Sequence, residues 1–120
     1  MTRRDFEALV AEALDGIPDE FAGYLENVAV VVEDEPSPAL LQDLEIDPRR
    51  DALYGLYQGV PLPDRPHDFA GLPDRITIYA GPLLRDFPPR RLRHEIQRTV
   101  VHEIAHFFGL DDTRVRKLGY

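Results

Sequence analysis

The chain has 120 residues, of which 43% are hydrophobic and 30% charged, a composition typical of one globular domain spanning residues 1–120. It contains no cysteine, which excludes disulfides, thiolate metal sites and a cysteine nucleophile. Its net charge of −8 argues against nucleic acid and against an anionic membrane surface as partners. Any metal site must therefore be built from His, Asp, Glu or backbone oxygen.

The first part of the chain predicts two helices and a strand. Apolar residues recur at helical spacing over residues 3–15, and Gly16 and Pro18 then end that helix. Acidic residues inside its apolar stretch distinguish it from a signal peptide, so a cytoplasmic location is expected. Residues 28–32 form a short run rich in β-branched side chains, which predicts a buried strand. Residues 38–44 are expected to form a short helix.

The middle of the chain predicts two strands separated by a long loop. The first strand is expected at residues 53–57, and it runs into a loop over 59–74 that is rich in proline and glycine. The loop is expected to border a binding cleft, with His67 as a solvated side chain. Residues 75–80 alternate in polarity and predict a further strand, which the pair Gly81-Pro82 should end.

A long helix is predicted from residue 89 or 90 to Gly109, followed by a short helix with Asp111 or Asp112 as its N-cap. The expected fold is therefore α+β, with helices on one side of a small mixed sheet of about three strands. The second half of the long helix, from Val100 onward, is apolar nearly all round, which predicts that it is buried.

The segment HEIAHFFGLDD, residues 102–112, contains the residues with the clearest chemistry. Residues four apart on a helix are neighbours, so the imidazoles of His102 and His106 can meet at one metal ion. Glu103 lies about 100° further around the helix, where its carboxylate can reach a water on the metal rather than the metal itself. This is the general-base position of an HExxH zinc site.

A catalytic zinc ion usually has three protein ligands and a water, so a third ligand is needed. The only strong ligand side chains after His106 belong to Asp111 and Asp112. Gly109 can take a left-handed conformation, end the helix in a sharp turn and bring Asp112 back toward the histidines. The motif is thus HExxHxxGxxD, which predicts zinc on His102, His106 and Asp112, with Asp111 as the reserve ligand.

Each of these residues also has a structural interpretation. His102, Glu103 and His106 could form a buried polar cluster that is satisfied by internal hydrogen bonds. Asp112 could serve as a helix N-cap, a role in which aspartate is common. His94, two turns upstream on the same helix, is expected to be an exposed residue rather than a ligand.

The sequence resembles the small bacterial zincin-like metallopeptidases, a family of minimal zinc peptidases. Besides HEIAHFFGLDD, the resemblance includes LYGLYQGVPL at 53–62 and RITIYAGPLLRDF at 75–87, so it covers most of residues 20–112. It implies a zincin-like α+β fold with the ligands and the base named above. The chain departs from the metzincins, which place a methionine turn downstream of the third ligand, because its sole methionine is Met1.

The expected function is that of a zinc-dependent hydrolase, in particular a metallopeptidase with Zn²⁺ as cofactor and peptides or proteins as substrates. Glu103 would take a proton from the zinc-bound water as it attacks a carbonyl, and would pass it to the leaving amine. The strand at 75–80 is the candidate sheet edge for pairing with an extended peptide. Alternative functions are a zinc-containing peptide-binding or regulatory module without turnover, a hydrolase of other amides, and a domain whose cleft is completed by a partner.

Overall fold

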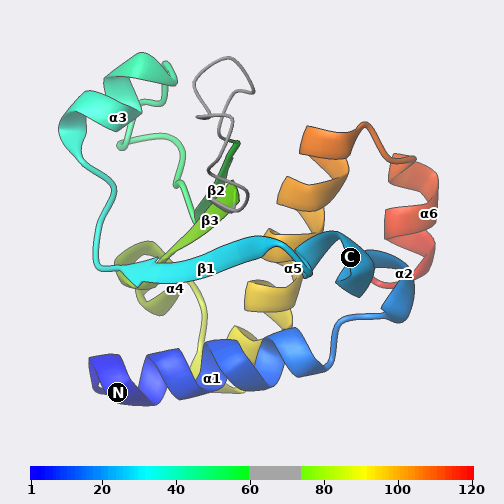
Figure 1. The fold of residues 1–120 in the computed structure, drawn as a ribbon. Coiled ribbons are helices and arrows are strands. Elements are labelled where there is room, and N and C mark those ends of the chain that lie inside the picture. Colours follow the sequence, from blue (N-terminus) through cyan, green and yellow to red (C-terminus); the bar gives the residue numbers. More distant parts are fainter. Residues whose placement is uncertain (60–73) are drawn as a thin grey trace, which may run out of the picture.

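The computed structural model describes residues 1–59 and 74–120 (Figure 1). The expectations for 60–73, including a loop that borders the cleft and His67 within it, lie outside the described residues. The elements follow in the order α1 Arg3–Asp15, α2 Asp19–Ala22, η1 Gly23–Leu25, β1 Val28–Glu33, α3 Pro38–Asp43, β2 Gly55–Gln58, β3 Asp74–Tyr79, α4 Ala80–Asp86, α5 Pro89–Phe108 and α6 Asp112–Lys117. This is the α+β arrangement that the sequence predicts. None of the described helices is both long and apolar enough to cross a membrane.

The three strands form one mixed sheet in the order β1-β3-β2, with β3 parallel to β1 and antiparallel to β2. β3 is therefore the central strand, and the expectation that residues 75–80 provide a sheet edge is wrong. The burial of its side chains agrees with this central position. Ile76 and Ile78 on one face and Thr77 and Tyr79 on the other are all buried, as expected of a strand that is covered on both faces.

β1 forms where the sequence predicts a strand, but it is less buried than expected. Its residues Val28 to Val32 are only partly buried, and Glu33 is exposed. Within the described part of the chain, β1 has a neighbouring strand on one side only. A run of β-branched residues thus indicates a strand, but it does not tell a central strand from an outer one.

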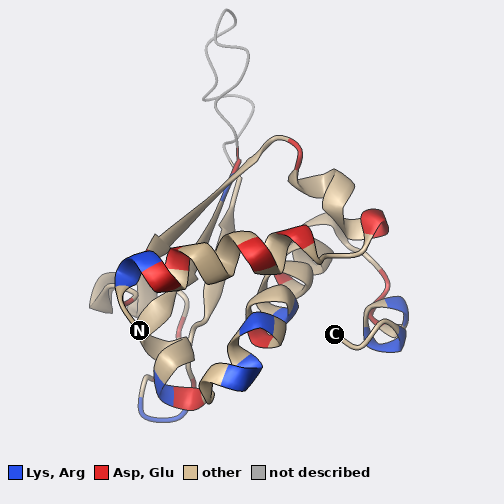
Figure 2. Ribbon diagram, turned by 90° about the horizontal axis from the view of Figure 1, so that it is seen from below, with Lys and Arg blue, Asp and Glu red and all other residues tan. Residues whose placement is uncertain are grey.

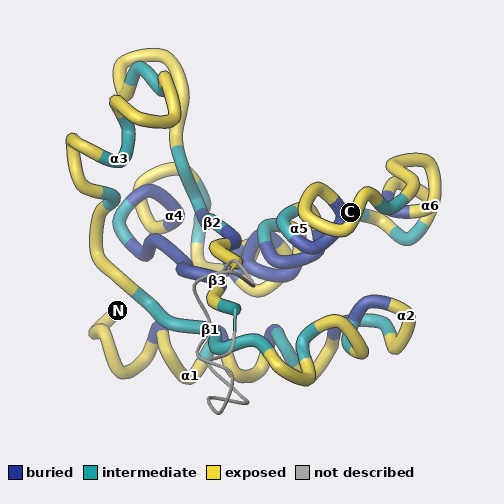
Figure 3. Tube along the Cα trace, turned by 45° about the horizontal axis from the view of Figure 1, so that its top comes forward, coloured by how far each residue is buried: buried dark blue, intermediate teal, exposed yellow. Residues whose placement is uncertain are grey.

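The core lies where α5 packs against α1 and against strands β2 and β3 (Figure 3). α1 begins with a capping box, in which Thr2 and Asp5 each accept a hydrogen bond from the backbone N–H of the other. Its residues Phe6, Val10 and Ala13 recur at helical spacing and are buried. α5 supplies the facing half of the core through five fully buried side chains: Leu92, Ile96, Val100, Val101 and Ile104.

The sequence does not predict three of the observed helical segments. Two of them, α2 and η1, are short turns between α1 and β1. The third is α4, which starts at Ala80 directly after β3, although Gly81-Pro82 predicts only a break. Pro82 lies in the first turn of α4, where a backbone N–H would have no partner inside the helix. A proline after a strand can therefore begin a helix as well as end the strand.

β2 approaches α5 closely at Gly55. A Cβ atom at this position would lie 2.6 Å from Cγ2 of Thr99 and 3.0 Å from the backbone oxygen of Thr77. The absence of a side chain therefore allows the backbone of β2 to lie directly on α5. The same stretch of β2 lines a hollow that also contains Glu103.

Substitution Gly55→Ala should destabilise the protein by about 1–3 kcal/mol, because the added methyl group overpacks the contact between β2 and α5. Adding Thr99→Ser should recover part of this loss, since serine lacks Cγ2 but keeps the hydroxyl that donates to the backbone oxygen of Glu95. Gly23→Ala is the control, because nothing lies within 4 Å of a Cβ atom there. Urea unfolding measures the free energies, and equal stability of the two alanine variants would contradict a tight contact.

Candidate active site

The long helix α5 presents both motif histidines on its solvent-facing side. Pro89 stands at the start of this helix, which continues for 20 residues to Phe108. His102 and His106 lie one helical turn apart, and both side chains are exposed. Both histidines therefore lie on the exposed side of the helix, one turn apart, as their spacing predicts.

The prediction that the second half of α5 is buried is wrong for the side of the helix that carries the two histidines. Val100, Val101 and Ile104 are fully buried, but Phe107 and Phe108 are 48% and 42% exposed. Apolar residues do surround the helix, yet only one side of it meets the core. The exposed histidines consequently do not form a buried polar cluster.

Gly109 ends α5 as the sequence predicts. Its backbone is left-handed, with φ of 66° and ψ of 37°, a conformation that glycine adopts without steric cost. The N–H groups of Gly109 and Leu110 both donate to the backbone oxygen of Ala105, the latter at 2.8 Å. These bonds close the helix and turn the chain toward α6.

The two aspartates after this turn have different roles in the fold. Asp111 is the N-cap of α6, because its Oδ1 accepts a hydrogen bond from the N–H of Thr113 at 2.9 Å. Asp112 is the first residue of α6, and its exposed side chain is not used in the cap. Asp111 therefore caps α6, and the Asp112 carboxylate is available for another partner.

Helix α6 is held in place by contacts with α2 and with the core. Arg114 forms two hydrogen bonds with the carboxylate of Glu20 in α2, at 2.9 and 3.0 Å. Val115 is buried in the core, with 1% of its surface exposed. The other basic residues of the last turn, Arg116 and Lys117, are exposed. Figure 2 shows the basic residues of α6 in blue. These contacts fix the backbone position of Asp112 relative to α5.

The four motif residues His102, Glu103, His106 and Asp112 line one hollow of about 500 Å³ at the end of α5. In the structure as it stands, no three His, Asp or Glu side chains among the described residues are gathered closely enough to hold a metal ion. One reason is that Nε2 of His102 contacts the backbone oxygen of Tyr120. The backbone thus brings the predicted ligands to one hollow, while the side chain of His102 contacts another partner.

Glu103 faces β2 and is anchored by it. The N–H of Tyr57 donates to Oε1 of Glu103 at 2.9 Å. Burial raises the pKa of Glu103 above its ordinary value of 4.5, while the Tyr57 N–H and the nearby His106 and His102 oppose this with smaller effects. Glu103 is thus a partly buried carboxylate with increased proton affinity.

Tyr57 can reach Glu103 because β2 is an outer strand of the described sheet. The N–H of Tyr79 donates to the backbone oxygen of Tyr54 at 2.9 Å. Backbone groups alternate in direction along an antiparallel pair, so those of Gly55 and Tyr57 point away from β3 and toward the side where Glu103 lies. The sheet edge beside the motif is therefore β2.

Comparison with known proteins shows the family of the chain, because the sequence profile of the zincin-like metallopeptidases matches residues 25–120. The chain belongs to the zincin-like metallopeptidase family. It is also similar to the solved structure of a conserved hypothetical protein from Thermus thermophilus, with 26% sequence identity and a TM-score of 0.56. That alignment covers 90% of this chain and 94% of the other. No protein of curated function matches.

The sequence pattern of a zincin-like protein does not reveal every residue that shapes this site. The anchoring of Glu103 by Tyr57 joins positions 46 residues apart, and no local pattern signals it. Glu95, the one charged residue that is buried in the described part of the chain, pairs with Arg91 at 2.9 Å and Arg98 at 3.7 Å. Here the spacing of three and four residues on a helix could have indicated the pairing.

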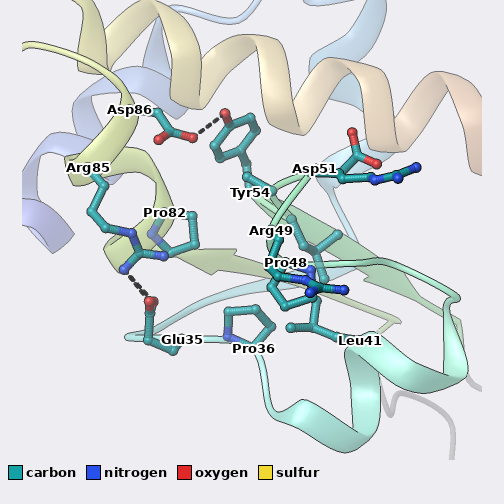
Figure 4. A pocket seen from close by; sticks show the side chains of 13 residues that line it. Glu35, Pro36, Leu41, Pro48, Arg49, Asp51, Tyr54, Pro82, Arg85 and Asp86 are labelled. Atoms are coloured by element: carbon teal, nitrogen blue, oxygen red, sulfur yellow. Dashed lines mark hydrogen bonds and ion pairs between the residues drawn. The ribbon is translucent and has the colours of Figure 1, made fainter.

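A larger hollow of about 570 Å³ lies apart from the zincin motif, between the segment around Arg49 and helix α4 (Figure 4). Its polar groups largely satisfy one another: Arg85 pairs with Glu35, and the Tyr54 hydroxyl donates to Asp86 at 2.6 Å. Burial, followed by this hydrogen bond, raises the pKa of Tyr54 to about 12. None of the described residues that line this hollow is a histidine, so the motif on α5 is the better candidate for a zincin-like site.

Glu103→Gln should stabilise the metal-free protein more at about pH 7 than at about pH 4. The folded state binds a proton at Glu103 more tightly than the unfolded state does, so the wild type loses stability as pH rises from below 4.5 through the raised pKa. Glutamine does not titrate there, and its amide oxygen can still accept from Tyr57. Urea unfolding in chelator at both pH values measures the difference, with Glu26→Gln as the control for losing one exposed carboxylate. An equal difference at both pH values would contradict the raised pKa.

Proposed function

We propose that the protein is a zinc-dependent metallopeptidase in which His102, His106 and Asp112 hold the metal and Glu103 is the general base. The observation that supports this most directly is that these four side chains line one hollow. Membership of the zincin-like metallopeptidase family supports the same function.

The donor set fits zinc in its chemistry. Two imidazoles and a carboxylate, with no thiolate, are a usual ligand set of catalytic zinc sites that keep one position open. All three ligand side chains are exposed, so they can turn toward a common ion without disturbing the core. His102 would have to exchange the backbone oxygen of Tyr120 for the metal.

In the proposed reaction, the residues of this chain position and move protons around the scissile bond. The bound metal would supply a Lewis acid that lowers the pKa of a water and polarises the substrate carbonyl. Glu103 accepts the proton of the attacking water and returns it to the leaving amine. The Tyr57 N–H fixes one oxygen of Glu103, and the other oxygen has no hydrogen-bond partner among the described residues. The raised pKa of Glu103 makes it a stronger proton acceptor than a solvated carboxylate.

A peptide is the substrate class that the neighbouring backbone favours. The outward-facing backbone groups of Gly55 in β2, beside Glu103, can hydrogen bond with an extended chain, as in β-strand addition. β2 takes the role that the sequence pattern suggests for residues 75–80, which lie in the centre of the sheet.

A second candidate function is a zinc-containing peptide-binding module without turnover. The hollow along β2, which also contains Glu103, favours it, because its side chains can hold part of a peptide whether or not the peptide is cut. Such a module would bind zinc and peptides but would leave the peptides intact.

Substitution Glu103→Gln should retain zinc but reduce peptide hydrolysis by about 10²- to 10⁴-fold, because the proton acceptor is lost while the ligands remain. Metal analysis of the purified proteins gives the zinc content. Digestion of a peptide library, with and without chelator, gives the activity, and Glu26→Gln is the matched control. Hydrolysis that is unchanged in Glu103→Gln would remove this residue from the role of base, and zinc without hydrolysis in the wild type would favour the binding module.

Asp112→Ala should weaken zinc binding by about tenfold or more, since the loss of a ligand exceeds the usual effect of an outer contact. Asp111→Ala should instead cost about 1 kcal/mol of stability through the lost helix cap, while its zinc affinity stays near that of the wild type. Competition with a chromophoric chelator measures the affinity, and thermal unfolding measures the stability. The reverse pattern would make Asp111 the ligand.

A further inference from the structure

A further hollow, of about 390 Å³, lies beside β2 and next to the proposed catalytic residues. It contains Glu103 and His106, which it shares with the hollow of the motif. Its size lies in the range of pockets that bind small groups. Any group bound there would therefore lie next to the bond that Glu103 is placed to hydrolyse.

The wall of this hollow is almost entirely apolar. It consists of side chains from the segment after α3, from β2 and from the end of α5: Leu44, Ile46, Leu53, Leu56, Tyr57 and Phe107. Two of them, Leu44 and Phe107, are 41% and 48% exposed, which is costly for large apolar groups unless a partner covers them. Phe107 is held in place by stacking on Tyr57, with ring centroids 4.0 Å apart.

Among the described residues, the only acidic or basic side chains that line this hollow are those of Glu103 and His106. A charged substrate side chain would lose its hydration there and find no charged partner outside the proposed catalytic site. The neighbouring hollow of about 300 Å³, which also contains Glu103, differs in having the charged side chains of Glu95 and Arg98 beside apolar ones such as Leu53. The two hollows that share Glu103 therefore differ in charge.

We propose that the apolar hollow bounded by Leu44, Leu56 and Phe107 is a specificity pocket that receives a large apolar side chain, such as leucine or phenylalanine, of the bound peptide. The proposal rests on the proposed function, because the occupant is a residue of the peptide that is presented to Glu103. The apolar lining of the hollow favours an uncharged side chain. Because Glu103 also lines the hollow, the backbone that carries this side chain would lie beside Glu103.

Direct binding tests the pocket without requiring turnover. The zinc-loaded Glu103→Gln chain is titrated with fluorescent, capped polyglycine peptides that carry one central Leu, Phe, Ser or Asp, and anisotropy gives the affinities. The Leu and Phe peptides should bind about tenfold to a hundredfold more tightly than the Ser and Asp peptides, as expected from burying one large apolar side chain. Equal affinities for all four peptides would overturn the pocket.

The matched variants are Leu44→Asp and Leu84→Asp, which alter two leucines of similar exposure, 41% and 40%. Leu84 lies on α4 and lines none of the hollows beside Glu103. Leu44→Asp should abolish the preference for Leu and Phe, whereas Leu84→Asp should keep it; loss of the preference in both variants, or in neither, would overturn the assignment. Incubating the same Leu peptide with wild-type protein tests the proposed function separately. Binding without cleavage would support the pocket and contradict the hydrolase.

Discussion

The contact between β2 and α5 determines most of what the site can do. At Gly55 the strand lies directly on the helix, because there is no side chain to separate it from Thr99. This proximity lets the backbone N–H of Tyr57 reach the carboxylate of Glu103. It also places the outward-facing edge of the strand along the row of motif residues. A helix with the same sequence but a more distant strand would keep its histidines and lose the anchored base.

The motif itself depends on local rules that are visible in the sequence. Helical periodicity sets the spacing of His102 and His106, and Gly109 ends the helix in the left-handed conformation that its position suggests. These features involve residues within one or two turns of each other, so a pattern is sufficient to predict them. The choice between Asp111 and Asp112 as the cap is also local, but it requires the observed hydrogen bond to Thr113.

The features that the sequence did not predict are those set by distant parts of the chain. The central position of β3 depends on which strands pair with it, and alternation within residues 74–79 does not specify that. The exposure of Phe107 and Phe108 depends on which side of α5 meets the core, since an all-round apolar pattern fits both outcomes. The raised pKa of Glu103 follows mainly from its burial, which depends on how the rest of the chain packs around α5.

The segment at Tyr120 occupies the ring nitrogen of His102 that the proposed metal site would use. Its backbone oxygen contacts Nε2 of His102, and its ring stacks on His94 with centroids 5.5 Å apart. One ring nitrogen cannot serve a carbonyl and a cation together. In the proposed site, the apparent affinity for a metal at that nitrogen would therefore be the intrinsic affinity multiplied by the fraction of molecules in which Tyr120 has left His102. Metal occupancy and the docking of Tyr120 would then be linked quantities.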